Sequence, residues 1–585
     1  MIHLRNTALG RRDTAFTLLA VSMFAALTAA PLQAVSPDEP IRALQRNPHL
    51  ADFFAYGFWH GQAPHDERLA GEFHEPTYES RRHKVLHHFA RNHINIYVTA
   101  NRMATEESLA AAGKYGIRQI SSAQFLLGHV KHSGDLQGDL TMEQVLQQIR
   151  KHVESVKDSP HLLGCLLYDE PGAKVAPFIR QVADAVRPAD SKHPPIYTHS
   201  ETPLDRLGHP HEWELVRSQD ILLSDSYTIT TRSGRDPWLY GDVIVPELRR
   251  ANPDALQWPI IQAFMYLALP TVPELRVQVY HTIAAGAKGM FCFTSNQAYF
   301  GAWASDHWYY RGVGNPWLGR EELMQEIGRI GEHLTTVGPL LIPLRYAPNY
   351  PAYVGAVDAP ADPPQMFQAY VLGTESNVGR ALGLRHSGEL QRPAVHVGAF
   401  SGVDYDVLVI HNNDPWRTRR AAVTVATRHE KVLDLATLET VSLDHTAGGV
   451  TFPVSFKPGD GRLYLVGDNA AVDAARRQVR RKRYAHQARQ LRPDAEITGR
   501  GGVDIRTFEQ TLEQEAAADD PATSLLRLAD ARTAPKTLSG HSPKSARILR
   551  RPDVVSMRST TGSTAPRSGP ANRTLVRNWA DLAIL

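Results

Sequence analysis

The chain has 585 residues, of which 42% are hydrophobic and 21% are charged, so it is long enough for two or more domains of ordinary globular composition. Its net charge is divided between a body of −7 over residues 35–467 and a terminal segment of +8 over residues 468–585. A mildly acidic body argues against nucleic acid as a partner, and two cysteines are too few for a disulfide framework or a cysteine zinc site.

The first 34 residues are typical of a secretory signal peptide. Arg5, Arg11 and Arg12 precede an apolar segment over 15–32, and Leu32-Gln33-Ala34 is a plausible small-residue cleavage site. We therefore expect a signal peptide over 1–34, a linker over 35–50, and an exported protein that is periplasmic or secreted. An uncleaved membrane anchor is the alternative, since 18 residues lie near the lower limit for crossing a bilayer. No later segment is long and apolar enough, so we expect no membrane span after cleavage.

A barrel is predicted over residues 51–345 by short apolar runs that alternate with amphipathic helical patterns. The helical patterns include 78–92, 105–115, 142–157, 175–186, 238–251 and 272–285. The strand-like runs span 53–61, 94–102, 117–124, 162–171, 195–201, 221–229, 259–266 and 289–297. Eight strands with crossover helices are typical of a (β/α)8 TIM barrel. A doubly wound open sheet is the competing architecture, but no GxGxxG turn follows the first strand.

Two further regions follow the predicted barrel. Residues 346–467 carry closely spaced strand-like segments with turn signals, which favours a β-sandwich accessory domain. Residues 468–585 are basic and contain three aromatic residues, so we expect a largely disordered tail in which short helices are possible. The basic run at 476–483 is interpreted as a solvated helix face, with contact to anionic envelope polymers as the alternative.

The segment LLGCLLYDEP at 162–171 contains the first candidate catalytic residues. An apolar run buried on both faces ends there in Asp169 and Glu170. Active sites of parallel α/β barrels lie at the carboxyl ends of the strands, so acids at this position are catalytic candidates. Neighbouring side chains on a strand point to opposite faces, so we expect only one of the two to face the pocket.

Hydrolysis of a glycosidic bond requires two carboxyl groups, and the second is less certain from the sequence. One group protonates the leaving oxygen, and the other acts as nucleophile or as base for water. Glu170 beside another carboxylate fits the raised pKa that a proton donor needs. Asp225, in LLSDSY at the end of the sixth strand, is the first choice of partner, and Glu201 after the fifth strand is the second.

Other polar and aromatic side chains at the predicted strand ends suit carbohydrate binding. Aromatic rings stack on the apolar face of a sugar, and imidazole, amide and hydroxyl groups hydrogen-bond to its hydroxyls. The candidates are Trp59, His60, Asn101, His199, Tyr227, Gln262, Asn296, Gln297, Trp303 and Trp308. No HExxH, P-loop, CxxC or GxSxG motif suggests another chemistry, and the predicted reaction requires neither a metal nor an organic cofactor.

A family resemblance supports this interpretation. LLGCLLYDEP, SDSY, WPIIQAF and AAGAKGMFCFTSNQ resemble bacterial (β/α)8 glycoside hydrolases of the clan A type, near the family 42 β-galactosidase-like barrels, over about residues 50–345. The resemblance implies a glutamate acid/base at the end of strand four, which corresponds to Glu170. It also implies a glutamate nucleophile at the end of strand seven, where this chain has Gln262. That departure makes Asp225 the leading second carboxylate, or means that the retaining chemistry has been lost or changed.

The sequence therefore predicts an exported glycoside hydrolase with a carbohydrate substrate, in which Glu170 is the general acid, Asp225 its partner and Asp169 and Glu201 support them. One alternative is a carbohydrate-binding protein on a degenerate barrel. Another is a polysaccharide lyase with Tyr227 or His199 as base. The sugar, the linkage, the anomeric outcome and the oligomeric state are not predicted.

Overall fold

The computed structural model describes residues 39–59, 78–99, 103–123, 141–170, 175–199, 210–227, 229, 235–265, 269–293, 298–299, 309–312, 321–356, 393–427, 429–446 and 449–497. The chain divides into two compact units, Met1–Asp519 and Asp520–Leu585. The second unit and the expected signal peptide lie outside the described residues, so the architecture below is that of the first unit.

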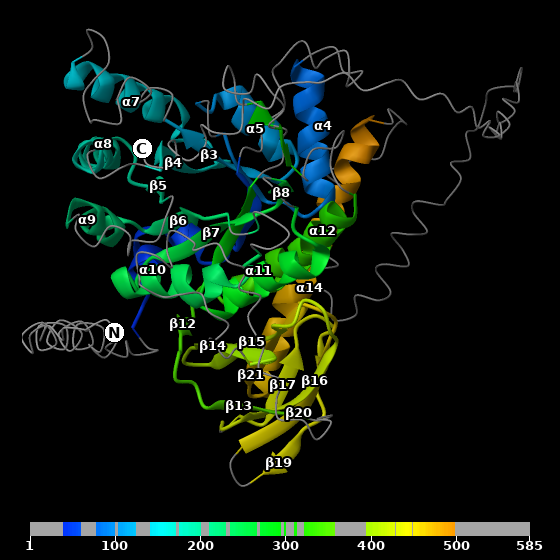
Figure 1. Ribbon diagram of the computed structural model, residues 1–585. Coiled ribbons are helices and arrows are strands. Elements are labelled where there is room, and N and C mark those ends of the chain that lie inside the picture. Colours follow the sequence, from blue (N-terminus) through cyan, green and yellow to red (C-terminus); the bar gives the residue numbers. More distant parts are fainter. Residues whose placement is uncertain are drawn as a thin grey trace, which may run out of the picture. The chain divides into compact units, whose positions relative to one another are not determined.

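A closed barrel of eight parallel strands forms the centre of this unit, which confirms the predicted TIM barrel (Figure 1). Its strands run in the order of the chain, and the first pairs with the last through Ala55–Gly289 to Trp59–Phe293. They are β1 (Ala55–Trp59), β2 (Ile96–Val98), β3 (Arg118–Ser122), β4 (Leu162–Asp169), β5 (Pro195–His199), β6 (Ile221–Asp225), β7 (Leu256–Gln262) and β9 (Gly289–Phe293). Each falls within or overlaps one of the predicted runs, so the apolar runs located all eight strands.

Crossover helices join these strands, as parallel pairing requires. They include α4 (Tyr78–Arg91), α5 (Glu106–Lys114), α7 (Met142–Val156), α8 (Ala176–Ala189), α9 (Pro210–Ser218), α10 (Val245–Ala251) and α11 (Val272–Ala284), and α12 (Glu321–Val337) follows the last barrel strand. Thr105, Thr141 and Thr271 cap α5, α7 and α11 in reciprocal capping boxes, which satisfy exposed N–H groups at the helix starts. The single helix expected over 238–251 begins as a π-helical turn, η3 (Tyr240–Ile244), before α10.

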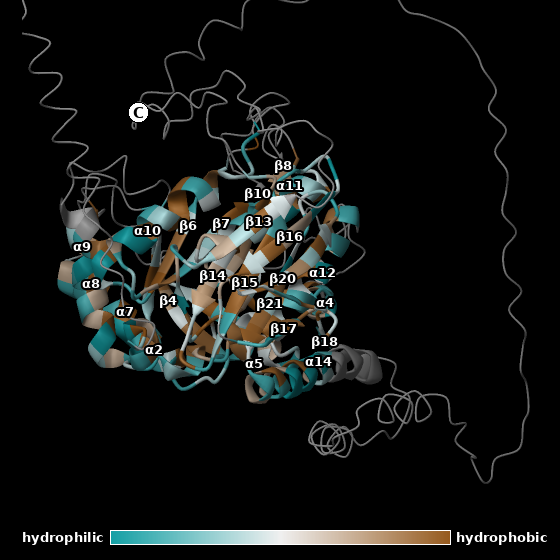
Figure 2. Ribbon diagram, turned by 90° about the horizontal axis from the view of Figure 1, so that it is seen from below, coloured by the Kyte–Doolittle hydropathy of each residue, from teal (hydrophilic) through white to brown (hydrophobic). Residues whose placement is uncertain are grey.

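The hydrophobic core has one part inside the barrel and another outside it. Inside, large side chains such as Trp59, Trp258 and Phe291 fill the interior, so the barrel is packed rather than open. Outside, the strands pack against the helices that cover them. Figure 2 shows the resulting pattern, with hydrophobic strands and hydrophilic colour on the surrounding helices. Cys165 and Cys292 are buried free thiols, as their positions in core strands predicted.

Antiparallel sheets follow the barrel, as the sequence predicted. A six-stranded sheet has the order β12-β14-β15-β21-β17-β18, and a four-stranded sheet the order β13-β16-β20-β19. Side chains of both sheets form a shared apolar cluster. The strands are β12 (Arg345–Tyr346), β13 (Ala352–Ala356), β14 (Val395–Ser401), β15 (Tyr405–Asn412), β16 (Arg419–Val425), β17 (Lys431–Asp434), β18 (Glu439–Thr440), β19 (Asp444–Thr446), β20 (Gly449–Phe456) and β21 (Gly461–Gly467).

Short elements complete the described part. β8 (Phe264–Met265), β10 (Ala298–Tyr299) and β11 (Tyr309–Gly312) form a small sheet that connects segments after β7 and β9. Before β1 lie α2 (Arg42–Arg46) and η1 (Pro48–Leu50), and after α12 lies η4 (Gly338–Leu340). Ala43 and Leu50 of the first two join the apolar cluster inside the barrel.

The basic segment after residue 468 begins with a long helix, α14 (Asn469–Ile497). Its Val472, Ala475 and Val479 are buried in the outer core, although we expected little packing here. The basic run at 476–483 lies on this helix, as the sequence predicted, and Lys482 pairs with Asp52 at 2.6 Å. Residues 498–585 of the expected tail lie outside the described residues.

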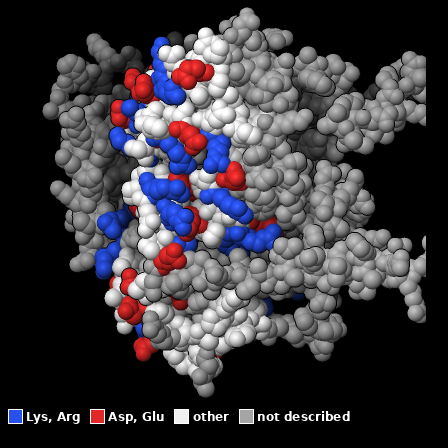
Figure 3. Space-filling model, turned by 90° about the vertical axis from the view of Figure 1, so that its left-hand side faces the viewer, with Lys and Arg blue, Asp and Glu red and all other residues white. Residues whose placement is uncertain are grey.

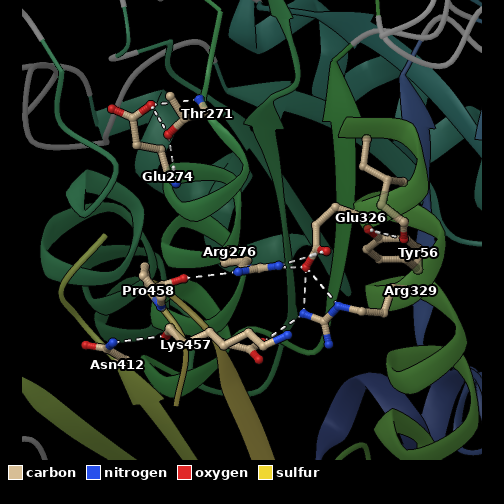
Figure 4. A network of polar contacts seen from close by, with 11 residues as sticks. Tyr56, Thr271, Glu274, Arg276, Glu326, Arg329, Asn412, Lys457 and Pro458 are labelled. Carbon is tan, nitrogen blue, oxygen red and sulfur yellow. Dashed lines mark hydrogen bonds and ion pairs between the residues drawn. The ribbon is translucent and has the colours of Figure 1, made fainter. Parts of the chain in front are cut away.

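A polar network connects barrel helices to the sheet region (Figure 4). Glu326 of α12 accepts hydrogen bonds from Arg276 of α11 at 2.7 and 3.1 Å and from Arg329 at 2.6 Å. Arg276 also donates to the Pro458 carbonyl, and Arg329 to Asp460 at 2.8 Å. Burial alone would raise the pKa of Glu326, but hydrogen bonds from the two arginines hold this pKa below its ordinary value.

The described surface carries charges of both signs. Figure 3 shows acidic and basic side chains interspersed on one face. Ion pairs between exposed side chains, such as Arg180–Glu214 at 2.5 Å, stabilise little individually. Among the described residues, no helix combines the length and apolar character needed to cross a membrane.

We expect Glu326→Gln to lower the free energy of unfolding at pH 7 by about 1.5–3 kcal/mol, because it weakens charge-assisted hydrogen bonds at a buried position. A carboxyl whose folded pKa is lowered stabilises the fold above its unfolded pKa and loses that effect as the pH falls through the folded pKa. The difference between variant and wild type should therefore shrink below about pH 4. Urea unfolding at pH 7 and pH 3 measures both values.

The control is Glu143→Gln, because the Glu143–Arg150 pair is exposed and should contribute less than about 1 kcal/mol. Equal losses in the two variants would show that the Glu326 network does not stabilise the junction.

Candidate active site

Three carboxyl groups meet at the carboxyl ends of two barrel strands. Asp169 is the last residue of β4, Glu170 follows it, and Asp225 is the last residue of β6. These strands are separated by β5 alone in the barrel. Their ends therefore bring acids from distant parts of the sequence to one end of the barrel, where TIM-barrel active sites lie.

The backbone of Glu170 explains why both neighbouring acids lie near Asp225. Glu170 has a φ of 52°, in the left-handed region that a non-glycine residue seldom adopts. Its backbone N–H donates to the Thr198 carbonyl at 3.0 Å, which ties the strained residue to β5. Strand alternation ends at Asp169, so the expectation that only one of the pair faces the pocket rests on a pattern that stops before Glu170. Such strain is concentrated at functional sites in proteins.

Asp225 is buried beside two other acids, Glu170 and Asp169. Burial raises the pKa of Asp225 well above its ordinary value, and the negative charges of Glu170 and Asp169 raise it further. Asp225 Oδ2 accepts a hydrogen bond from the Tyr227 hydroxyl at 3.1 Å. Its Oδ1 has no donor among the described residues, but protonated Asp225 can itself donate to the Glu170 carboxylate. The protonated form of Asp225 is therefore favoured in the fold.

Asp169 is the second carboxyl whose protonated form is favoured. Burial and the charge of Glu170 raise its pKa to about 7, although hydrogen bonds to Thr198 and Trp59 act in the opposite direction. Near neutral pH the cluster contains both proton donors and proton acceptors, which general acid–base catalysis requires.

Two tyrosines hold the end of β6 in place. The Ser226 N–H donates to the Tyr240 hydroxyl at 2.6 Å, and this hydroxyl donates to the Ile260 carbonyl of β7. The Tyr227 ring packs edge-on against the Phe264 ring, with 4.8 Å between the ring centroids. Burial, and after it the charge of Asp225, raises the pKa of both tyrosines well above its ordinary value, so both keep their protons.

The structure places other predicted site residues in the barrel wall or interior. Trp59 is 1% exposed and packs edge-on against Phe291. Its ring therefore lies in the core and not where a sugar could stack on it. Its side chain instead contacts Asp169 and helps to orient that carboxyl. His199, at the end of β5, is buried against Tyr197 with 4.5 Å between ring centroids.

Gln262, at the end of β7, is fully buried and its amide is bound to backbone. Its Nε2 donates to the Ile229 carbonyl at 2.9 Å, and its Oε1 accepts from the Ile229 N–H at 2.9 Å. Backbone atoms of Gln262 exchange further bonds with the Gln278 side chain. These contacts fix the segment after β6 against β7. Gln262 therefore has a structural role, whereas the sequence analysis considered it for sugar binding.

The remaining predicted residues lie outside the described residues. They are Glu201, His60, Asn101, Asn296, Gln297, Trp303 and Trp308. Sequence analysis did not identify Tyr240 or Thr198 as members of the site. Tyr240 belongs to an amphipathic helical pattern, in which a tyrosine is typical of the core, and no local signal marks its contact with the end of β6.

Comparisons with known proteins find similar solved structures but no match among family models or curated proteins. The match to a beta-galactosidase from the psychrophilic Marinomonas ef1 has 12% identity and a TM-score of 0.38, and covers 50% of this chain and 62% of that one. A catalytic mutant of a family 42 beta-galactosidase from G. stearothermophilus has 10% identity and a TM-score of 0.45, with coverages of 71% and 98%.

A family 5 glycoside hydrolase from Bacteroides vulgatus matches with 12% identity and a TM-score of 0.42, and with coverages of 72% and 89%. Glycoside hydrolases of several families are therefore among the similar structures, as the sequence resemblance implied. At these identities and TM-scores, the similarities assign no reaction to this chain.

We expect Asp225→Asn to stabilise the fold at pH 8. The asparagine oxygen can still accept from Tyr227, and its NH2 group can donate to Glu170. Unlike Asp225, the asparagine cannot ionise, so the variant avoids the cost of a buried negative charge at high pH. A carboxyl with a raised folded pKa binds its proton more tightly in the folded state, so wild-type stability falls as the pH rises from about 4 to the folded pKa. The melting temperature of the variant should exceed that of the wild type at pH 8 and approach it near pH 4.

Asp404→Asn, at an exposed position, is the matched control and should leave the melting temperature nearly unchanged at both pH values. A lower melting temperature for Asp225→Asn at pH 8 would contradict the protonated, buried state of Asp225.

Proposed function

We propose that this chain is an exported glycoside hydrolase that cleaves O-glycosidic bonds with the Glu170–Asp225 pair. The observation that carries the proposal is the meeting of Glu170 with Asp225 at the ends of strands four and six of a closed barrel, where burial and the neighbouring negative charges raise the pKa of Asp225. Glycoside hydrolysis needs one carboxyl that gives a proton and one that accepts a proton or attacks. A buried carboxyl with a raised pKa beside a second, exposed carboxyl can supply both forms.

Exposure indicates which member meets the substrate. Glu170 is exposed at the barrel end, whereas Asp225 is 6% exposed and lies behind it. In the proposed reaction Glu170, protonated by exchange within the pair, donates to the departing oxygen as the bond from that oxygen to the anomeric carbon breaks. Water attacks the anomeric carbon and gives its proton to the Asp225 carboxylate, so the pair again holds one proton at the end.

A bound sugar would set the final separation of the two carboxyls. Catalytic carboxyls are about 5–5.5 Å apart in retaining enzymes and about 6.5–9.5 Å apart in inverting enzymes. Asp225 and Glu170 lie close enough for the charge of Glu170 to raise the pKa of Asp225, so substrate binding between them would fix which of the two geometries applies. Glu170 is the member that can move, because it is exposed and its backbone lies beyond the end of β4.

The contacts of Gln262 favour one alternative, a protein that binds carbohydrate without cleaving it. No carboxyl is available at the end of β7, and the Gln262 amide is already bound to Ile229. A lyase with Tyr227 as base is disfavoured. The Tyr227 hydroxyl donates a hydrogen bond to Asp225, and burial raises the pKa of Tyr227 well above its ordinary value, so this hydroxyl stays protonated. Lyase products would also absorb in the ultraviolet, whereas hydrolase products would not.

We expect Glu170→Gln and Asp225→Asn each to lower kcat by about 10²–10⁴-fold, the contribution of a positioned acid or base. The assay screens aryl glycosides and polysaccharides for released reducing ends, with sugar binding measured in parallel by calorimetry. Glu214→Gln, an exposed carboxyl of α9, is the control and should keep full activity. Melting curves establish that each variant is folded.

Two results would count against the proposal. Sugar binding without any turnover by the wild type would support the binding protein instead. Full turnover by folded Glu170→Gln would remove Glu170 from the mechanism.

A further inference from the structure

Away from the carboxyl cluster, three histidines from separate elements bring their rings together beside the barrel. His281 lies on α11, His396 on β14 and His411 on β15. His396 and His411 are direct partners in the antiparallel ladder, so their side chains share one face of the sheet. The ring centroids of His281 lie 5.2 Å from those of both other histidines.

The nitrogens of these rings are spaced like the ligands of one metal ion. His411 Nε2 lies 3.2 Å from His281 Nδ1 and 3.4 Å from His396 Nδ1. One nitrogen of each ring lies within 4.8 Å of the others. A tetrahedral zinc ion with Zn–N bonds of about 2.0–2.1 Å holds its ligand nitrogens about 3.3–3.4 Å apart. The two short spacings therefore match two edges of a zinc coordination tetrahedron.

Hydrogen bonds among the three neutral rings account for these nitrogen spacings less well than a bound metal ion does. His281 Nε2 lies 2.7 Å from Asp242 Oδ1 and donates to it, so Nδ1 of the neutral ring carries a lone pair that can bind a metal ion. If His411 carried its proton on Nε2, its buried Nδ1 would be an acceptor without a donor. If His411 carried its proton on Nδ1, two lone pairs would face each other across the 3.2 Å gap to His281.

A cation between the rings resolves this conflict. His411 can then keep its proton on Nδ1 while its Nε2 binds the ion. His411 is fully buried, where the neutral imidazole that binds metals is favoured over the charged form.

Asp242 supplies the outer contact that metal-binding histidines have in known sites. Such histidines almost always donate their second ring N–H to a carboxylate, a carbonyl or water, which fixes the tautomer and orients the ring. Asp242 lies on η3, and η3 approaches α11 so closely that a Cβ on Gly241 would lie 2.2 Å from the His281 ring. Glycine at 241 thus permits the contact between His281 and Asp242.

We propose that His281, His396 and His411 bind one Zn²⁺ ion, with Asp242 as the orienting partner of His281 and a water as the fourth ligand. His281 and His411 are buried and His396 is partly exposed, so water reaches the ion from the His396 side. The bound ion connects barrel helix α11 to the six-stranded sheet. This inference is independent of the proposed hydrolase activity, because none of its residues belongs to the carboxyl cluster.

The test uses the full chain, purified from zinc-supplemented culture and dialysed against zinc-free buffer. We expect about one zinc per chain by mass spectrometry in the wild type and in His445→Gln, a control at an exposed histidine of β19. His396→Gln should retain little zinc. Asp242→Asn should weaken zinc binding by about 10–100-fold, the usual effect of losing an outer contact.

A second measurement separates metal binding from misfolding. Zn²⁺ should raise the melting temperature of the metal-free wild type and should not raise that of His396→Gln, and Mg²⁺, which prefers oxygen ligands, should affect neither. Similar melting curves of the two proteins in chelator would show that the variant is folded. The proposal is overturned if the wild type retains no zinc above a buffer blank, or if folded His396→Gln retains as much zinc as the wild type.

Discussion

Closure of the barrel is the constraint on which the candidate site depends. A closed parallel sheet brings the ends of β4 and β6 to the same end of the barrel, and Asp169, Glu170 and Asp225 stand at those ends. Burial and the neighbouring negative charges raise the pKa of both Asp169 and Asp225, which favours their protonated forms. Burial of these carboxyls raises their pKa values and so enables proton exchange near neutral pH. The same burial makes their ionised forms unfavourable and therefore lowers the stability of the fold.

Much of the fold could be predicted because its signals are local. Eight apolar runs separated by amphipathic helices define a parallel barrel in which position along the chain determines position in the sheet, so the meeting of Glu170 with Asp225 followed from sequence order. Other features depend on contacts between distant residues. The amide of Gln262 binds the backbone of Ile229, 33 positions away, and a glutamine after a strand gives no local sign of such a partner. The sequence of helix α14 likewise shows mainly charged residues, and only the structure shows that its Val472 and Val479 pack in the outer core.

The histidine cluster shows the same limit more clearly. His281 and His411 are 130 positions apart, in a barrel helix and in a strand of the following sheet, so no spacing motif connects them. Only the packing of α11 against β14 and β15 brings the three rings together. The close approach has a sequence cause, since a Cβ on Gly398 would lie 2.0 Å from the Ala284 carbonyl oxygen.

The π-helical turn η3 physically connects the two sites. Tyr240, its first residue, contacts the end of β6, and Asp242, two positions later, contacts His281. Residues two apart on a helix point away from each other, so one turn can reach the carboxyl cluster with one side chain and the histidine cluster with the other. Turns of π-helix are frequent at functional sites because the extra residue changes the direction of the side chains that follow. The position of η3 therefore has to satisfy both clusters, and that shared requirement gives a physical reason for a π-helical turn where the sequence pattern predicted an ordinary α-helix.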